Sequence, residues 1–150
     1  KAAALHDIGK IGIRDSVLQK EGKLTPEEYK HIQEHVEITH NILEKIHMSE
    51  DFQQITEIAC SHHEKYDGTG YPGGKSGESI NTETQIIAVC NFFDNLTSNR
   101  TSYQIRNTKE ALRVMLQMGT KKFSADALYT FVHMFSYNDT TNFEEMVQQH

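Results

Sequence analysis

The sequence predicts an all-α fold, a bundle of packed helices. Apolar residues recur about every 3.6 positions in several long segments, as they do on the buried face of a helix. No segment of useful length alternates apolar and polar residues in the way a half-buried strand does. Glycines gather in two loops between these segments, and the rest of the chain keeps the helical pattern.

The first expected elements are short. Residues 1–7 read as the last turns of a helix, which Gly9 and Gly12 then break. A short turn is expected over residues 16–19. The chain opens at Lys1 without a methionine, so we expect this stretch to end a helix that begins upstream.

The strongest helix start is the run Thr25-Pro26-Glu27-Glu28. Thr25 can cap the helix, Pro26 suits its first turn, and Glu28 three residues later completes a capping box. The helix beyond it carries a stripe near the helical period, made of Ile32, His35, Val36, Ile38, Ile42 and Leu43.

Four further helices are expected, with one long loop among them. The loop covers residues 65–78 and is rich in glycine. The helices are predicted over residues 51–63, over 82–98 as a buried helix, over 108–118 with a stop at Gly119, and from a cap at Ser124 to about Phe135.

Composition limits the classes of function. At 150 residues the chain is long enough for one domain with a real hydrophobic core. A net charge of -6 argues against binding a nucleic acid polymer, which needs a basic face. No apolar run reaches the roughly 18 to 20 residues of a membrane span, and no secretory signal is visible. Cys60 and Cys90 lack CxxC spacing, so they are interpreted as reduced core thiols of a cytoplasmic protein.

A set of imidazoles and carboxylates indicates a metal centre. The candidate ligands are His6, Asp7, His35, His62 and His63. Imidazole and carboxylate groups together suit divalent transition metals, and a helical bundle collects such ligands from several helices. Adjacent ligands diverge by about 100° on a helix. His62 and His63 therefore serve two metals, or one metal from a distorted helix end. Asp7 offers two oxygens and can bridge two ions about 3.5–4 Å apart, which together activate water and neutralise a phosphodiester.

Lys10 is the candidate phosphate-binding and catalytic side chain beside this set. It follows Asp7 by three residues, past Gly9, and can touch a phosphate oxygen or help to protonate a leaving alkoxide. A solvated lysine at a helix end is the alternative interpretation. The remaining histidines are interpreted as ordinary surface or core residues: His31, His40, His47, His133 and His150.

Several motifs in a fixed order resemble the HD-GYP family of metal-dependent phosphohydrolases. They are His6-Asp7-Ile8-Gly9-Lys10, then His35, His62-His63-Glu64, Asp67 to Pro72, and Asp94 to Arg100. The resemblance implies that residues 1–150 are an HD-GYP domain lacking one or more N-terminal helices. It implies a phosphodiesterase that opens cyclic di-GMP, with two or three divalent metal ions, iron or manganese. It gives metal-ligand roles to the five candidates above, phosphate contacts to Lys10 and Arg100, and substrate or partner contacts to Gly70, Tyr71 and Pro72.

Two positions depart from the pattern of the resembled family. Asn91 stands where the family has a metal-binding aspartate, and it offers a neutral carbonyl oxygen in place of a charge. Tyr103 replaces a basic residue that helps to hold the ligand. The helix before His6 that supplies a further ligand in the family is also missing from this sequence.

Three functions stay open. The first is a phosphodiesterase for a cyclic dinucleotide in bacterial second-messenger signalling, joined to an upstream sensor or receiver domain. The second is a binding module that has lost turnover through Asn91 and meets a signalling protein through its Gly-Tyr-Pro loop. The third is an HD phosphohydrolase for another nucleotide.

Overall fold

The computed structural model describes residues 1–46, 50–98 and 107–136. Within these ranges the chain is helical and contains no β-strand, apart from an isolated antiparallel bridge between Asp67 and Ser76. The all-α prediction is confirmed. The elements in chain order are α1 (Ala2–Leu5), the 3-10 helix η1 (Ile8–Gly12), α2 (Asp15–Leu18), α3 (Pro26–Glu44), α4 (Glu50–Cys60), the 3-10 helix η2 (Gly77–Ser79), α5 (Thr82–Thr97), α6 (Thr108–Lys122) and α7 (Ala125–Ser136).

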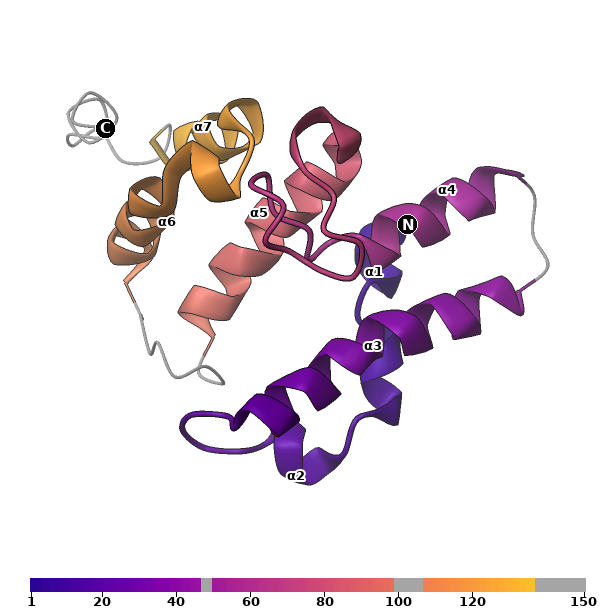
Figure 1. Cartoon of the computed structure of the whole chain (residues 1–150). Coiled ribbons are helices and arrows are strands. Elements are labelled where there is room, and N and C mark those ends of the chain that lie inside the picture. Colours follow the sequence, from indigo (N-terminus) through magenta and orange to yellow (C-terminus); the bar gives the residue numbers. More distant parts are fainter. Residues whose placement is uncertain (47–49, 99–106, 137–150) are drawn as a thin grey trace.

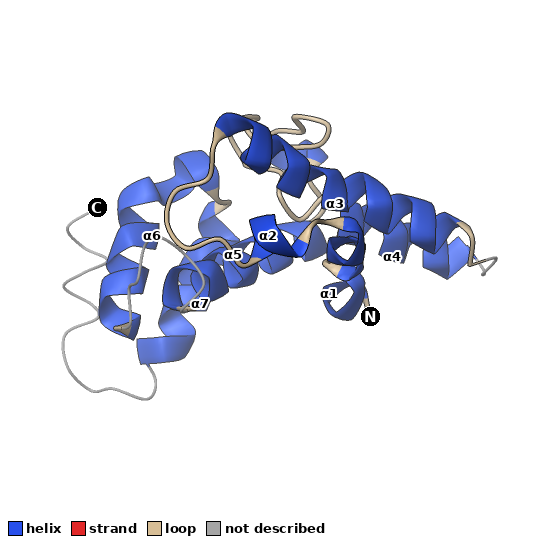
Figure 2. Ribbon diagram, turned by 90° about the horizontal axis from the view of Figure 1, so that it is seen from below, coloured by secondary structure: helices blue, strands red, loops and turns tan. Residues whose placement is uncertain are grey.

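The helices form two groups joined by the loop between α4 and α5 (Figure 1). In the first group α3 packs along α4 and covers η1, while α1 packs on α4. Figure 2 shows the same group from below, with α1 and α2 beside α3. In the second group α5, α6 and α7 pack against one another. The loop therefore lies where the two groups meet.

Local signals in the sequence set most helix starts. Thr25 accepts a hydrogen bond from the Glu28 N–H (3.3 Å), and the Glu28 carboxylate accepts one from the Thr25 N–H (2.7 Å). The capping box expected there is confirmed. Ser124 Oγ accepts a hydrogen bond from the Ala127 N–H (3.2 Å), which confirms the predicted cap of α7.

Two expected helix ends differ from the prediction, and two burial assignments are wrong. The helix expected over 51–63 ends at Cys60, so His62 and His63 lie in a turn. Gly119 leaves helical geometry as expected (φ 59°, ψ -160°), but helical hydrogen bonding resumes and continues to Lys122. Cys90 is exposed, because it lies one helical turn after the exposed Ile86, on the solvent side of α5, while Cys60 is buried as predicted. The helix expected to be buried over 82–98 is therefore buried on one side only.

Each helix group has its own apolar core. The larger core joins α5, α6 and α7 through residues such as Leu112, Met115 and Leu128, all fully buried. The smaller core joins α1, α3 and α4 around Leu43 and Ala59. No helix in the described ranges is long and apolar enough to cross a membrane.

Candidate metal centre

The His6-Asp7 pair lies in a tight turn between α1 and η1. The Gly9 N–H donates to Thr39 Oγ1 on α3 (3.0 Å), and the Thr39 hydroxyl donates to the His6 carbonyl oxygen (3.3 Å). A side chain at Gly9 would collide with the His35 carbonyl oxygen, so only glycine lets η1 lie this close to α3. Thr39 and Gly9 thus fix the turn that presents Asp7.

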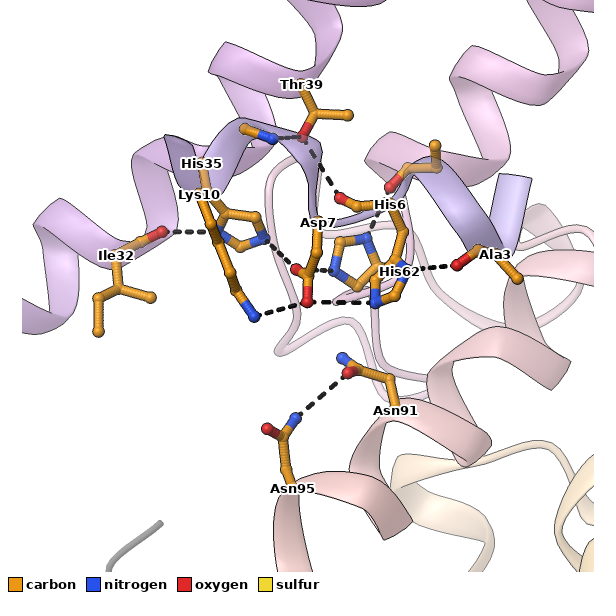
Figure 3. Close-up of polar contacts among 12 residues, drawn as sticks. Ala3, His6, Asp7, Lys10, Ile32, His35, Thr39, His62, Asn91 and Asn95 are labelled. Carbon is orange, nitrogen blue, oxygen red and sulfur yellow. Dashed lines mark hydrogen bonds and ion pairs between the residues drawn. The ribbon is translucent and has the colours of Figure 1, made fainter. Parts of the chain in front are cut away.

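Four of the predicted ligands converge on one point. Asp7, His35, His62 and His63 each offer a ligand atom, and these atoms lie within 4.8 Å of one another. Asp7 Oδ1 lies 3.5 Å from His35 Nε2 and 3.8 Å from His62 Nε2. Figure 3 shows Asp7 between the rings of His35 and His62.

His62 and His63 reach the same point because the chain has left the helix after Cys60. The turn brings their ring centroids within 4.0 Å of each other, with an interplanar angle of 45°. The divergence of about 100° expected for helical neighbours does not apply to a turn. The distorted helix end, one of the two alternatives drawn from the sequence, describes this arrangement.

Backbone carbonyls set the tautomer of three histidines. The Nδ1 atoms of His6, His35 and His62 lie 2.8, 2.5 and 2.6 Å from the carbonyl oxygens of Ala3, Ile32 and Ala59. A carbonyl oxygen can only accept, so each Nδ1 carries the proton, and the Nε2 atoms of His35 and His62 keep their lone pairs. His6 Nε2 instead faces Asp7 Oδ2 and donates to it when the ring is protonated. This is the usual outer-shell arrangement of metal-binding histidines.

The charge states in the cluster suit a cation. Burial lowers the pKa of His62 to about 4 and also lowers the pKa of His35, so both rings are neutral at pH 7. Burial alone would raise the pKa of Asp7, but hydrogen bonds from His6 and Lys10 outweigh it and hold the pKa well below its usual value. Metal ligands must be unprotonated, and these are.

His6 and Lys10 face the other oxygen of Asp7. Lys10 Nζ lies 2.6 Å and His6 Nε2 3.3 Å from Asp7 Oδ2. The hydrogen bond to Asp7 raises the pKa of His6. His6 is therefore outside the group of four but adjoins it, with its ring centroid 4.7 Å from that of His62.

Unpaired polar atoms test whether the residues fit a metal. In the described ranges, Asp7 Oδ1, His35 Nε2 and His62 Nε2 are buried without a hydrogen-bond partner. Leaving such atoms unpaired costs about 1–3 kcal/mol each, and more for a charged group. All three atoms carry a lone pair and converge on one point, an arrangement that a bound cation satisfies. The residues fit a divalent metal ion.

Asn91 lies on α5, on the side of the cluster away from α3. Its side chain points from α5 toward His6 and His62 in Figure 3. Asn95 Nδ2 donates to its Oδ1 at 3.4 Å. The Asn91 amide thus faces the cluster from the second helix group, whereas the four convergent side chains belong to the first group and its adjoining turn.

The Gly-Tyr-Pro segment divides between the site and the surface. The Tyr71 ring stacks on His63, with centroids 4.6 Å apart and an interplanar angle of 18°. Pro72 is exposed and lines a separate cavity of about 590 Å³ between α3 and α4. Arg100 and Tyr103 lie outside the described residues.

The other histidines are away from the cluster where they are described. His31 is half-buried and pairs with Glu34 (2.6 Å), while its Nε2 accepts a hydrogen bond from the Arg14 N–H (3.3 Å). His40 and His133 are exposed. His47 and His150 fall outside the described ranges.

Two residues of the site were missed by reasoning from sequence. Thr39 follows His35 by four residues, so the shared helix face was the available signal. Glu64 follows His63 directly and is buried, with 3% of its surface exposed. Its partners are backbone groups of the loop, and no spacing in the sequence reveals them.

Comparison with known families identifies the fold and the cluster together. Residues 1–126 match the family model described as HD domain. The chain belongs to the HD domain family. HD domain proteins are metal-dependent, in agreement with the convergent Asp7 and histidines.

Curated relatives confirm the resemblance to the HD-GYP branch. The cyclic di-GMP phosphodiesterase of Thermotoga maritima is 39% identical over 133 residues, which are 89% of this chain and 36% of that protein. The 3'3'-cGAMP-specific phosphodiesterase 3 of Vibrio cholerae is 40% identical over 115 residues, 77% of this chain and 24% of that protein. The cyclic di-GMP phosphodiesterase response regulator RpfG of Xanthomonas campestris is 48% identical over 100 residues, 66% of this chain and 26% of that protein. This HD domain chain thus spans about a third or less of the relatives it matches.

Proposed function

We propose that this HD-GYP chain belongs to a metal-dependent phosphodiesterase that hydrolyses a cyclic dinucleotide, cyclic di-GMP or 3'3'-cGAMP, in bacterial signalling. The observation that carries the proposal is the convergence of three buried, unpaired lone-pair donors, Asp7 Oδ1, His35 Nε2 and His62 Nε2, next to a lysine. The functions for which the relatives are named supply the substrate class.

Two or three divalent ions, iron or manganese, are proposed as the cofactor. His6, Asp7, His35, His62, His63 and Asn91 are the proposed ligands. Bound divalent ions would supply Lewis acidity, neutralise phosphate charge and lower the pKa of water. Asp7 turns one oxygen to the buried histidines and the other to His6, so its carboxylate can serve two positions.

Lys10 is proposed to hold a phosphate oxygen of the substrate. Its side chain is 41% exposed, and its ammonium lies 2.6 Å from Asp7 Oδ2, so it reaches both solvent and the cluster. A cation at this position stabilises the negative charge that develops on the phosphate oxygens during hydrolysis. Arg100, Gly70, Tyr71 and Pro72 are proposed to complete the substrate contacts.

The remaining proposals concern the whole protein. One relative is named a response regulator, which supports a sensor or receiver domain upstream of an HD-GYP domain at residues 1–150. A cytoplasmic location and a signalling partner at the Gly-Tyr-Pro loop stay predictions. Pro72 is the exposed residue of that motif available to such a partner.

A binding module without turnover is the second candidate, and Asn91 is the observation that favours it. An amide in place of a carboxylate removes a negative charge from the α5 side of the cluster. One metal position would then be weaker, and the cluster would bind a cyclic dinucleotide without opening it.

Metal content and hydrolysis together test the proposal. The full-length protein, purified without chelators, is analysed for metals and assayed with cyclic di-GMP, 3'3'-cGAMP and linear nucleotides. Two or more ions per chain with hydrolysis of a cyclic dinucleotide support the enzyme. One ion with binding but no hydrolysis supports the module, and hydrolysis of another nucleotide alone indicates a different phosphohydrolase.

Asn91→Asp separates the first two candidates. We expect it to raise metal content and hydrolysis together if the missing charge limits the wild-type protein. A variant that gains neither metal nor activity excludes Asn91 as the cause of any loss.

Lys10→Ala should keep its metal and lose turnover, and loss of metal instead contradicts the proposed role of Lys10.

A further inference from the structure

Glu64 is a buried carboxylate that the proposed chemistry does not use. It directly follows His62 and His63 but is not among the four residues whose ligand atoms converge. Its Oε1 accepts a hydrogen bond from the Gly73 N–H (2.7 Å), and its Oε2 accepts one from the Lys75 N–H (3.0 Å). A buried carboxylate requires such donors, and here the donors come from the far side of the Gly-Tyr-Pro loop.

The loop that Glu64 holds closes directly on His63. The Tyr71 N–H donates to the His63 carbonyl oxygen (3.2 Å). A side chain at Gly70 would collide with the backbone of residues 63–65, so only glycine permits this approach. The flat face of Tyr71 then lies on the His63 ring, nearly parallel to it.

His63 is held differently from the other histidines of the site. His6, His35 and His62 are each oriented by a carbonyl oxygen of their own helical turn. Across the described ranges, the recorded contacts of the His63 ring are with other rings: His35 at 5.1 Å, His62 at 4.0 Å and Tyr71 at 4.6 Å. Of these neighbours Tyr71 is the one stacked flat on His63, so it restricts the tilt of the ring.

We propose that Glu64 and Tyr71 are positioning residues for His63: Glu64 holds the loop closed, and the loop presses the Tyr71 ring against the imidazole. This inference rests on the proposed metal-dependent function and adds a clamp to one ligand of that site. Part of the Gly-Tyr-Pro motif, the Tyr71 ring, then positions a side chain of the proposed metal centre.

Cobalt binding by the full-length protein tests the clamp, with Co²⁺ alone as the probe and absorbance as the readout. Tyr71→Leu removes the flat ring and should lower Co²⁺ affinity about tenfold, the effect usual for an outer-shell partner of a metal ligand. Tyr71→Phe keeps the ring and should stay within about twofold of wild type. Glu64→Gln places an amide N–H against one of the backbone donors and should also lower affinity about tenfold.

Glu57→Gln is the matched control. Glu57 binds the same loop through Lys75 Nζ (2.8 Å), but both side chains are exposed, so affinity should not change. The ring signals of His63 in the metal-free protein give a second readout by NMR. We expect one sharp set in wild type and Tyr71→Phe, and broadened or doubled signals in Tyr71→Leu, with His62 unchanged.

Wild-type affinity and an unchanged His63 spectrum in Tyr71→Leu would overturn the clamp. Equal losses in Tyr71→Phe and Tyr71→Leu would also overturn it, because the flat ring would then not be the cause. A wild-type protein that binds Co²⁺ but hydrolyses no nucleotide would contradict the proposed enzymatic function. In that case a lowered Co²⁺ affinity of Tyr71→Leu would still support the clamp.

Discussion

The two helix groups of this HD domain bury different kinds of residue. In the group of α5, α6 and α7, apolar side chains fill the interior, with Leu112, Met115 and Leu128 fully buried. In the group of α1 to α4 and its adjoining turn, fully or nearly fully buried positions include His35, Thr39, His62 and Glu64. In the described ranges, the group of α5, α6 and α7 leaves one buried side-chain oxygen unpaired, Thr84 Oγ1. The group of α1 to α4 and its adjoining turn leaves three unpaired lone-pair atoms that converge, an arrangement that a bound cation would satisfy. Both groups therefore have an apolar core, but the four convergent side chains belong to the group of α1 to α4 and its adjoining turn.

Gly9→Ala should have the largest effect, because it acts where the polar interior is most tightly packed. The added methyl would collide with the His35 carbonyl oxygen and Thr39, so η1 would have to move from α3. We expect a loss of more than about 3 kcal/mol in unfolding free energy, and loss of metal binding. Urea unfolding and metal titration measure both.

Gly77→Ala is the control for Gly9→Ala. Gly77 has a positive φ of 54° but open space around it, so it should cost only about 1 kcal/mol. Similar costs at the two positions would show that packing against α3 does not constrain Gly9.

Leu128→Ala tests the apolar group. Leu128 is fully buried in the larger core, and truncation of such a leucine costs about 3 kcal/mol. We expect a lower urea midpoint with unchanged Co²⁺ affinity of the folded protein. A fall in affinity comparable to that of Tyr71→Leu would show that the two groups are not separable in this way.

Lowering the pH should destabilise the metal-free protein through the polar group. The pKa of His62 is about 4 when folded and 6.5 when unfolded, so the unfolded state binds more protons between these values. The contribution of His62 to the free energy of unfolding is complete above pH 6.5 and is lost as the pH falls to about 4. The total loss from this group is up to about 3 kcal/mol. The raised pKa of His6 acts in the opposite sense but at higher pH, because its contribution grows as the pH falls toward 6.5 and is constant below that value.

Urea midpoints at pH 7, 5.5 and 4.5, with chelator present, measure this dependence. His62→Gln should show a shallower decline than wild type because it lacks the titrating ring. Parallel declines in the two proteins would assign the pH dependence to other groups.

Lys122→Met should have the smallest effect, since it breaks a partly exposed link between the groups. Lys122 Nζ donates to Asp67 Oδ2 (2.7 Å) and Thr69 Oγ1 (2.8 Å), which ties the loop to the end of α6. Exposed pairs contribute little stability, so the melting temperature should fall much less than in Leu128→Ala. Amide hydrogen exchange in the loop, measured by mass spectrometry, should nevertheless become faster. An unchanged exchange rate would show that Lys122 does not hold the loop to α6.

Local sequence signals predicted the fold well because helices depend on local rules. The capping box at Thr25 and the cap at Ser124 needed only neighbouring residues. The sequence left open whether His62 and His63 face one point, because this depends on where α4 ends. No local signal in the sequence marks the end of α4 at Cys60. A helix that continued through His62 and His63 would have pointed the two rings about 100° apart.

The supporting residues of the site were beyond sequence reasoning for a related reason. Thr39 acts by bonding a turn 30 residues earlier, and its role exists only once η1 lies on α3. Glu64 acts on residues 73 and 75 of a loop without regular structure. Neither contact follows a periodic spacing, whereas the ligand residue types themselves were readable from their chemistry.

The carbonyl oxygens that orient His6, His35 and His62 belong to the backbone three residues earlier in each case. No single substitution can delete a carbonyl oxygen, so these orienting bonds are insensitive to changes of side chain at Ala3, Ile32 and Ala59. The orientation of His63 depends instead on two side chains, Tyr71 and Glu64, and each can be lost by one mutation. Accumulating mutations would therefore disturb the candidate metal centre first at His63 and last at the three rings that backbone carbonyls orient.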